Sequence, residues 1–149
     1  MRATIQRVNK ASVTINDKIH SEISKGLLVF LGVKEDDLDK DLDYIVDKVI
    51  NMRIFQDEND KMNLSIQDVE GEILIVSQFT LYGDMRKGRR PSFTESAGHE
   101  KAEFYYDKFI KEIKRHINVV KTGVFAADMK INLTNDGPVT IQLDSNKIY

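Results

Sequence analysis

The sequence predicts an α+β fold: a single domain whose largely antiparallel or mixed, barrel-like sheet is covered by two main helices. Three observations predict it. Short segments near both ends alternate apolar and polar residues, as half-buried strands do. A continuous apolar run, Gly26 to Val33, has the length and β-branched content of a strand buried on both faces. Two longer segments repeat apolar residues every three or four positions, which marks one face of a helix.

The first strands are expected as a short pair, at residues 3–8 and 12–15. In the second of them Val13 and Ile15 alternate with Ser12 and Thr14, the two-residue period of a strand with one buried face. The apolar run 26–33 follows and is bounded by glycines. Because this run has no polar face, we expect it to be covered on both sides.

The next segment changes to a helical period, and its apolar residues share one face: Leu38, Leu42, Ile45, Val46, Val49 and Ile50. Asp36 and Asp37 are expected to cap the start of this helix, where acidic residues also favour the positive end of the helix dipole. Residues 57–61 then indicate a turn. Residues 72–79 return to the pattern of a strand.

A second amphipathic helix is expected over residues 97–117, with its apolar face made of Ala102, Tyr105, Tyr106, Phe109, Ile113 and Ile117. Two alternating strands close the chain, one marked by Met129, Ile131 and Leu133 and the other by Val139, Ile141 and Leu143. Asn135 to Pro138 lie between them. Proline cannot donate to a strand ladder, so Pro138 is expected at the start of its strand or at a sheet edge.

Composition excludes several classes of function. The chain has 149 residues with no repeat or linker, which predicts one domain over residues 1–149. It contains no cysteine, which removes thiol nucleophiles, thiolate metal sites and disulfides. The start of the chain lacks the apolar core of a signal peptide, and no apolar run approaches a membrane span. We therefore expect a cytoplasmic protein without a membrane partner.

The histidines do not suggest a metal site. His20, His99 and His116 are scattered and have no partner at metal-ligand spacing, so each is better interpreted as a surface or helix-edge residue. The chain has neither a G-x-S-x-G elbow nor a P-loop. We expect no metal and no cofactor. If the protein is a hydrolase, it works without a histidine base or a thiolate.

Polar groups gather instead at the end of the strand over residues 72–79. Ser77, Gln78, Phe79 and Thr80 stand where an apolar strand gives way to a loop, a position suited to a site because the strand is rigid and the loop is open. An ordinary strand end with its turn is the alternative. Net charge is −2, so RNA contact would need a local patch. One candidate patch is Arg86, Lys87, Arg89 and Arg90; a solvated loop is the alternative.

Two segments in the C-terminal half of the chain resemble the motifs of a known protein family. SQFTLYGD (77–84) and NDGPVTIQLD (135–144) look like the two signature motifs of the D-aminoacyl-tRNA deacylases. The likeness extends along the chain, since residues 1–15, 26–33, 51–66, 86–93 and 125–140 resemble family segments in the same order. There are two small departures. Ala126 stands where the family more often has glycine, and Gly83 where it often has alanine.

The resemblance implies hydrolysis of the ester between a D-amino acid and tRNA by a homodimer whose active sites lie at the subunit interface. In the family, the glycine and proline that correspond to Gly137 and Pro138 form a cis bond and reach into the partner's pocket. A rigid backbone wall of this kind is our hypothesis for how L-amino acids are rejected. By the same resemblance Arg7 is expected to brace that loop, and Phe125 and Met129 to line the substrate pocket. The basic cluster becomes a phosphate contact for the tRNA acceptor end.

The residues permit a mechanism that uses little acid–base machinery. An aminoacyl ester is already activated, and its tetrahedral oxyanion is best stabilised by fixed N–H donors, for which the backbone of Phe79 and Thr80 is the candidate. A nucleophilic Thr80 remains an alternative, although no base beside it is evident. By resemblance, the substrate's ribose hydroxyl assists the attacking water. An L-amino-acid proofreading module for a synthetase and a non-catalytic RNA-binding module are the alternative functions.

Overall fold

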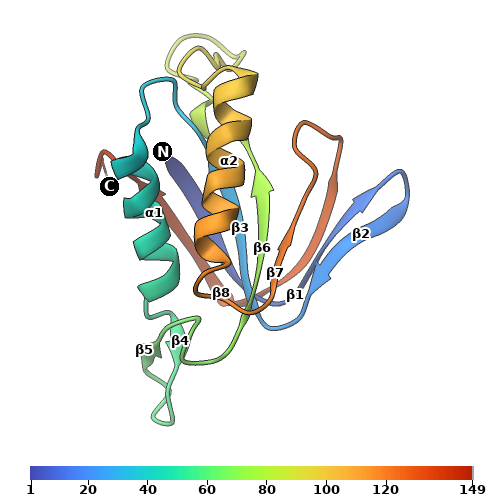
Figure 1. Cartoon of the computed structure of the whole chain (residues 1–149), viewed down its shortest axis with the longest axis vertical. Helices are drawn as coiled ribbons and strands as arrows, with labels where there is room; N and C mark the ends of the chain where they lie inside the picture. Colours follow the sequence, from blue (N-terminus) through green and yellow to red (C-terminus); the bar gives the residue numbers. More distant parts are fainter. Residues whose placement is uncertain (149) are drawn as a thin grey trace.

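The computed structural model describes residues 1–148. It shows a curved, mixed six-stranded sheet with two helices packed on one of its faces, and a separate two-stranded sheet, β4–β5 (Figure 1). Pairing runs in the order β2-β1-β3-β6-β7, and β8 joins the free side of β1. All pairs that involve β1 are antiparallel, whereas β3–β6 and β6–β7 are parallel. The elements are β1 (Arg2–Ile15), β2 (Lys18–Ile23), β3 (Gly26–Gly32), α1 (Asp39–Asn51), β4 (Phe55–Gln56), β5 (Met62–Leu64), β6 (Glu72–Ser77), the 3₁₀ helix η1 (Phe79–Tyr82), α2 (His99–Ile113), β7 (Val120–Thr122) and β8 (Lys130–Asp144).

The two short strands expected at the N-terminus are one long strand. β1 runs without a turn from Arg2 to Ile15; its first half pairs with β3 and its second half with β2. Exposed Asn9 and Lys10 interrupt the alternation that suggested two strands. The ladder to β8 shifts register around Val8, so the chain bends there and continues instead of reversing.

The two closing strands are also one strand, β8, which pairs along both halves of β1. Gln6 pairs with Thr140 and Val8 with Asn135, so residues 136–139 stand opposite Arg7 alone and form a wide bulge. The Gly137–Pro138 peptide in this bulge is cis, as the resemblance implies. Pro138 has no N–H to donate, but this breaks no hydrogen bond between strands, because the bulge lies outside the ladder and β8 pairs only with β1 among the described strands.

Both helices lie where the apolar periodicity predicts them, but the predicted cap of the first is wrong. The N–H of Leu38 donates to Asp41 at 2.9 Å, inside α1. Asp37 instead accepts from the amino group of Met1 at 2.5 Å and from the N–H of Lys34. Asp36 pairs with the Lys34 ammonium at the surface. The buried amine is a stronger partner for Asp37 than a helix N–H, because both groups are charged.

The core occupies both faces of the sheet. Alternate β3 residues, Leu27, Val29 and Leu31, pack toward the helices, whereas Leu28 joins a second cluster enclosed by the curled ends of β1, β2 and β8. This confirms that residues 26–33 form a strand buried on both faces. The turn at 57–61 is confirmed as well, because the Asp57 carboxylate accepts the N–H of Lys61 and closes the β4–β5 hairpin. Neither helix of residues 1–148 has the length and apolar character that crossing a membrane requires.

Candidate active site

A cavity of about 610 Å³ opens where β3 and β6 end, between the first turn of α2 and the loop before β8. It is lined by five of the residues expected from the sequence to form the site: Ser77, Gln78, Phe79, Phe125 and Met129. Parallel pairing of β3 with β6 brings both carboxyl ends to the same edge of the sheet. The end of β6 at Ser77 therefore borders this cavity.

The chain leaves β6 through a tight approach to β3. The N–H of Gln78 donates to the carbonyl of Leu31 at 2.8 Å, and the chain then enters η1. Gly32 makes the approach possible, because a Cβ there would lie 3.0 Å from the Gln78 carbonyl oxygen and 3.2 Å from Leu81 Cβ. Strand 72–79 was thus predicted two residues too long: it ends at Ser77, and Phe79 begins η1.

The start of η1 presents backbone donors. Its bonds run from Leu81 N–H to the Gln78 carbonyl at 3.3 Å and from Gly83 N–H to the Thr80 carbonyl at 2.9 Å. The N–H groups of Phe79 and Thr80 precede the first bonded turn, and the first N–H groups of a helix have no acceptor inside it. The Phe79 ring is 55% exposed and packs edge-on against Phe93, 5.0 Å between centroids, at the mouth of the cavity.

Thr80 does not line the cavity, although the sequence grouped it with its neighbours. Its hydroxyl accepts the side-chain amide of Gln78, and no imidazole or carboxylate of residues 1–148 hydrogen-bonds to it. A threonine hydroxyl needs such a base to become a nucleophile. The geometry around Thr80 therefore favours a role for its backbone.

The opposite wall includes residues that sequence reasoning assigned elsewhere. His99, interpreted as a surface residue, stands at the start of α2 and also lines the cavity, with its ring edge-on to Phe125 at 5.0 Å. The hydroxyl of Tyr106 donates to the Ile75 carbonyl at 2.9 Å, and burial raises its pKa. Tyr106 is thus a neutral structural wall. No spacing in the sequence sets His99 apart from a helix-edge histidine.

Gly137 and Pro138 lie away from the cavity. Arg7, which faces the bulge, pairs with Leu27 in the β1–β3 ladder, whereas the cavity begins at Leu31. Four residues of strand span about 13 Å. In Figure 1, β6 points to the upper end of the molecule, while β8 bends at the lower end.

The bulge is held by side chains of β1 and β8 and by one backbone carbonyl from the segment after α1. Arg7 is 5% exposed; its Nε lies 2.9 Å from the Asp136 carboxylate, and its Nη1 donates to the Ile54 carbonyl at 2.5 Å. The amide of Asn135 donates to the carbonyls of Arg7 and Val139, both at 2.9 Å. Gly137 and Pro138 are themselves exposed. An exposed tip held by a buried arginine suits contact with another molecule.

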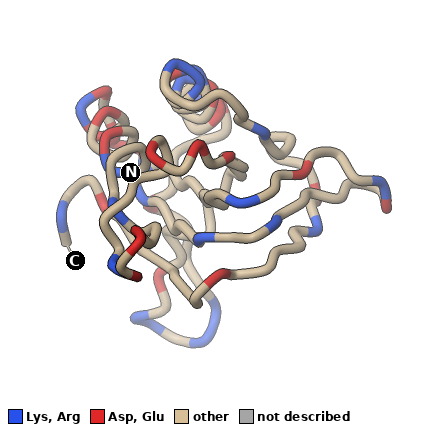
Figure 2. Tube along the Cα trace, turned by 90° about the horizontal axis from the view of Figure 1, so that it is seen from below, with Lys and Arg blue, Asp and Glu red and all other residues tan. Residues whose placement is uncertain are grey.

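The basic cluster lies on the loop between η1 and α2 and forms a mostly blue projection in Figure 2. Arg86 is already paired: its Nε and Nη2 donate to the Asp84 carboxylate at 2.9 and 2.8 Å. These bonds hold the pKa of Asp84 at about 2. Lys87, Arg89 and Arg90 are exposed, and no carboxylate of residues 1–148 lies within ion-pair distance of them.

Similarity to known proteins covers the whole chain. Residues 4–144 match the family model described as D-Tyr-tRNA(Tyr) deacylase. The chain belongs to the D-aminoacyl-tRNA deacylase family. It is 56% identical to the D-aminoacyl-tRNA deacylases of Thermosipho melanesiensis and Clostridioides difficile, over the full length of each. Members of this family are hydrolases of aminoacyl ester bonds.

Two solved structures share the fold of this family member. One, described as c-Myc DNA unwinding element binding protein, has a TM-score of 0.92 and 40% identity over 97% of this chain and 98% of that chain. The other is described as a probable eukaryotic D-amino acid tRNA deacylase, with a TM-score of 0.83 and 21% identity over 96% and 98%. The latter likeness supports the α+β fold alone. Residues 1–148 contain no cluster of three His, Asp or Glu side chains suited to a metal.

Proposed function

We propose that this chain removes D-amino acids from tRNA as a homodimer in which Gly137–Pro138 of each subunit completes the cavity of the other. The observation that carries the proposal is the separation of the two motifs. The cavity at Ser77–Phe79 lacks a Gly-Pro wall of its own, and the Gly-Pro tip, about 13 Å away along β3, is exposed and braced. A two-fold dimer brings the same two surfaces together twice.

Chemistry in this site rests on the backbone. Water attacks the ester carbonyl, and the charge that develops on its oxygen is stabilised by the N–H groups of Phe79 and Thr80. The tetrahedral intermediate then collapses, and the ribose oxygen of the tRNA leaves with a proton. Thr80 has no base that would make its hydroxyl a nucleophile. The neighbouring ribose hydroxyl of the substrate assists the attacking water.

Selection of D-amino acids rests on the Gly-Pro tip. The carbonyls of Gly137 and Pro138 accept the substrate α-ammonium, and an L side chain then points into the backbone and collides with it. A backbone wall of this kind accepts D side chains of many sizes because it does not contact them. The ion pair of Arg7 with Asp136 keeps the wall in place.

The same wall predicts hydrolysis of glycyl-tRNA, because glycine has no side chain to collide. The test compares turnover of D-alanyl-, L-alanyl- and glycyl-tRNA by one enzyme preparation. We expect turnover of the D-alanyl and glycyl esters at similar rates and an inert L-alanyl ester. An enzyme that preferred the L-ester would be an L-proofreading module, and one that only bound tRNA would be an RNA-binding module. Either outcome would overturn the proposal.

The exposed cations Lys87, Arg89 and Arg90 are proposed to contact phosphates of the tRNA acceptor end. Their loop also contributes Phe93 and Ser96 to the cavity wall, so the cations and the reacting ester lie on the same side. Phosphate contacts position a nucleic acid without reading its sequence. One site can then serve many tRNAs.

Composite sites can be tested by mixing two variants that are each impaired. Gly137→Ala alters the wall, and Ala127→Trp fills the cavity from the loop before β8. A heterodimer of the two variants has one cavity and one wall that are both intact and that face each other. Heterodimers purified by two tags should recover about half of the wild-type activity per dimer. Inactive heterodimers, or an active monomer in sedimentation, would exclude the composite site.

A further inference from the structure

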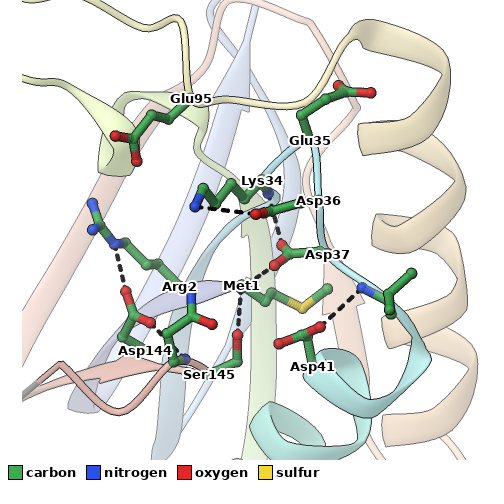
Figure 3. A network of polar contacts seen from close by, with 12 residues as sticks. Met1, Arg2, Lys34, Glu35, Asp36, Asp37, Asp41, Glu95, Asp144 and Ser145 are labelled. Carbon is green, nitrogen blue, oxygen red and sulfur yellow. Dashed lines mark hydrogen bonds and ion pairs between the residues drawn. The ribbon is translucent and has the colours of Figure 1, made fainter.

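Arg2 connects the end of the chain's last strand to the turn that carries the proposed oxyanion donors. Its Nε donates to the Asp144 carboxylate at 2.7 Å, as Figure 3 shows. Its Nη1 donates to the carbonyl of Leu81 at 2.9 Å. Its guanidinium also lies over the ring of Tyr82, 4.5 Å from the centroid. Leu81 and Tyr82 are the last two residues of η1.

The surroundings hold Arg2 in this geometry. Asp144 is 3% exposed and also accepts the N–H of Asn146 at 2.7 Å. The preceding residue is fixed because the Met1 amino group bonds to Asp37 and to the Ser145 hydroxyl (Figure 3). The Tyr82 ring is buried, and desolvation together with the nearby carboxylates raises its pKa. The ring therefore stays neutral and offers the cation its π face.

A turn as short as η1 cannot hold its own orientation. Its one-turn 3₁₀ bonding includes a long 3.3 Å bond, and 3₁₀ hydrogen bonds have poorer geometry than those of an α-helix. At the start of the turn, the Gln78 N–H is tied to the Leu31 carbonyl. At its end, the bonds of Arg2 provide the corresponding anchor.

We propose that Arg2 is a positioning residue for the deacylation reaction: it holds η1 so that the N–H groups of Phe79 and Thr80 point at the developing oxyanion. The inference rests on the proposed function, in which those two groups stabilise the charge. Arg2 does not line the cavity, so it acts through η1. Arginine suits this role because its planar fork binds a carboxylate, a carbonyl and a ring at once. A lysine ammonium is a single point charge.

The test compares Arg2→Lys with Arg2→Gln in the full-length protein. Arg2→Lys keeps a cation beside Asp144, so we expect it to retain most of the thermal stability. It should lower kcat about tenfold to a hundredfold and change KM less than about twofold, because small misplacements of catalytic groups cost this much in rate. Arg2→Gln should lose both stability and kcat. Ser145→Ala, a change in the same network without contact to η1, should lower stability and leave kcat unchanged.

A second readout does not depend on turnover. The amide resonances of Phe79 and Thr80 in nuclear magnetic resonance spectra should shift in Arg2→Lys and stay in place in Ser145→Ala. A folded Arg2→Lys protein with wild-type kcat or with unmoved Phe79 and Thr80 resonances would overturn the positioning role. Failure of the proposed function would look different: the wild-type enzyme itself would not hydrolyse D-aminoacyl-tRNA, or would do so through a trapped acyl-Thr80.

Discussion

Gly137→Ala probes the wall and its support with one methyl group. The φ angle of Gly137 is +115°, a backbone conformation that residues other than glycine rarely adopt. A Cβ there would lie 2.8 Å from Nη2 of Arg7 and 2.9 Å from Cγ2 of Val139. The guanidinium cannot yield freely, because it is held by Asp136 and by the Ile54 carbonyl.

Two costs add up for this variant. A non-glycine residue in such a backbone region costs about 1–3 kcal/mol. A displaced Arg7 weakens a charged hydrogen bond, which costs about 1.5–3 kcal/mol. We therefore expect a loss of about 2.5–6 kcal/mol in the free energy of unfolding. For a domain of this size, this loss corresponds to a drop in Tm of about 5–24 °C.

Gly88→Ala is the matched control. Gly88 has a φ of +78°, yet nothing lies within 4 Å of the position of its Cβ. Gly88→Ala therefore has only the cost of placing a non-glycine residue at a positive φ, so urea unfolding should show a loss of about 1–3 kcal/mol in the free energy of unfolding. The difference between the two variants measures the cost of the contacts with Arg7 and Val139. Equal losses would refute the argument that Arg7 braces the bulge.

Activity gives the second measurement on Gly137→Ala. At a temperature where the variant is folded, the wall is displaced, so hydrolysis of D-alanyl-tRNA should fall and its ratio to L-alanyl-tRNA should decrease. Both rates are followed by release of labelled amino acid. A folded variant that keeps the wild-type D-to-L ratio would exclude the Gly137–Pro138 wall as the device that rejects L-amino acids.

Four further outcomes are expected. The carboxyl of Asp84 should titrate in ¹³C spectra with a pKa of about 2, because Arg86 donates to it. The contribution of this ion pair to loop order is present above the ordinary pKa of 3.8 and is lost as pH falls through about 2. Arg86→Ala should return the midpoint of the Asp84 titration toward 3.8. Arg89→Gln should weaken tRNA binding and flatten its salt dependence more than Arg86→Gln, since Arg86 is already neutralised; equal effects would contradict this. Thr80→Ala should keep substantial deacylase activity, and a loss as large as removal of a nucleophile would reject the water mechanism. Ala126→Gly should stabilise by up to about 1 kcal/mol in urea unfolding, because Ala126 has a φ of +59°, whereas a clear loss would show that its methyl contributes to packing.

Local sequence patterns determined much of the fold. The periodicity of residues 38–50 and 97–117 located both helices, with the second predicted too long by two residues at its start and four at its end. The uninterrupted apolar run identified β3 as a strand buried on both faces. The motifs at Ser77 and Gly137 identified the family. These features depend on neighbours along the chain, which set which face of a helix or strand is apolar.

Other features depend on which segments meet. The alternation of apolar and polar residues at the two chain ends predicted which face of each strand is buried. It could not show that each pair of short strands is one long strand, β1 or β8, that continues through a shift of register. It could not show that Asp37 prefers a buried amine to a helix N–H, or that Asp84 neutralises Arg86. Arg2 and His99 carried no signal either, because their partners are distant in sequence. Charge pairing and cavity walls arise from side chains that only the packed sheet brings within reach of one another.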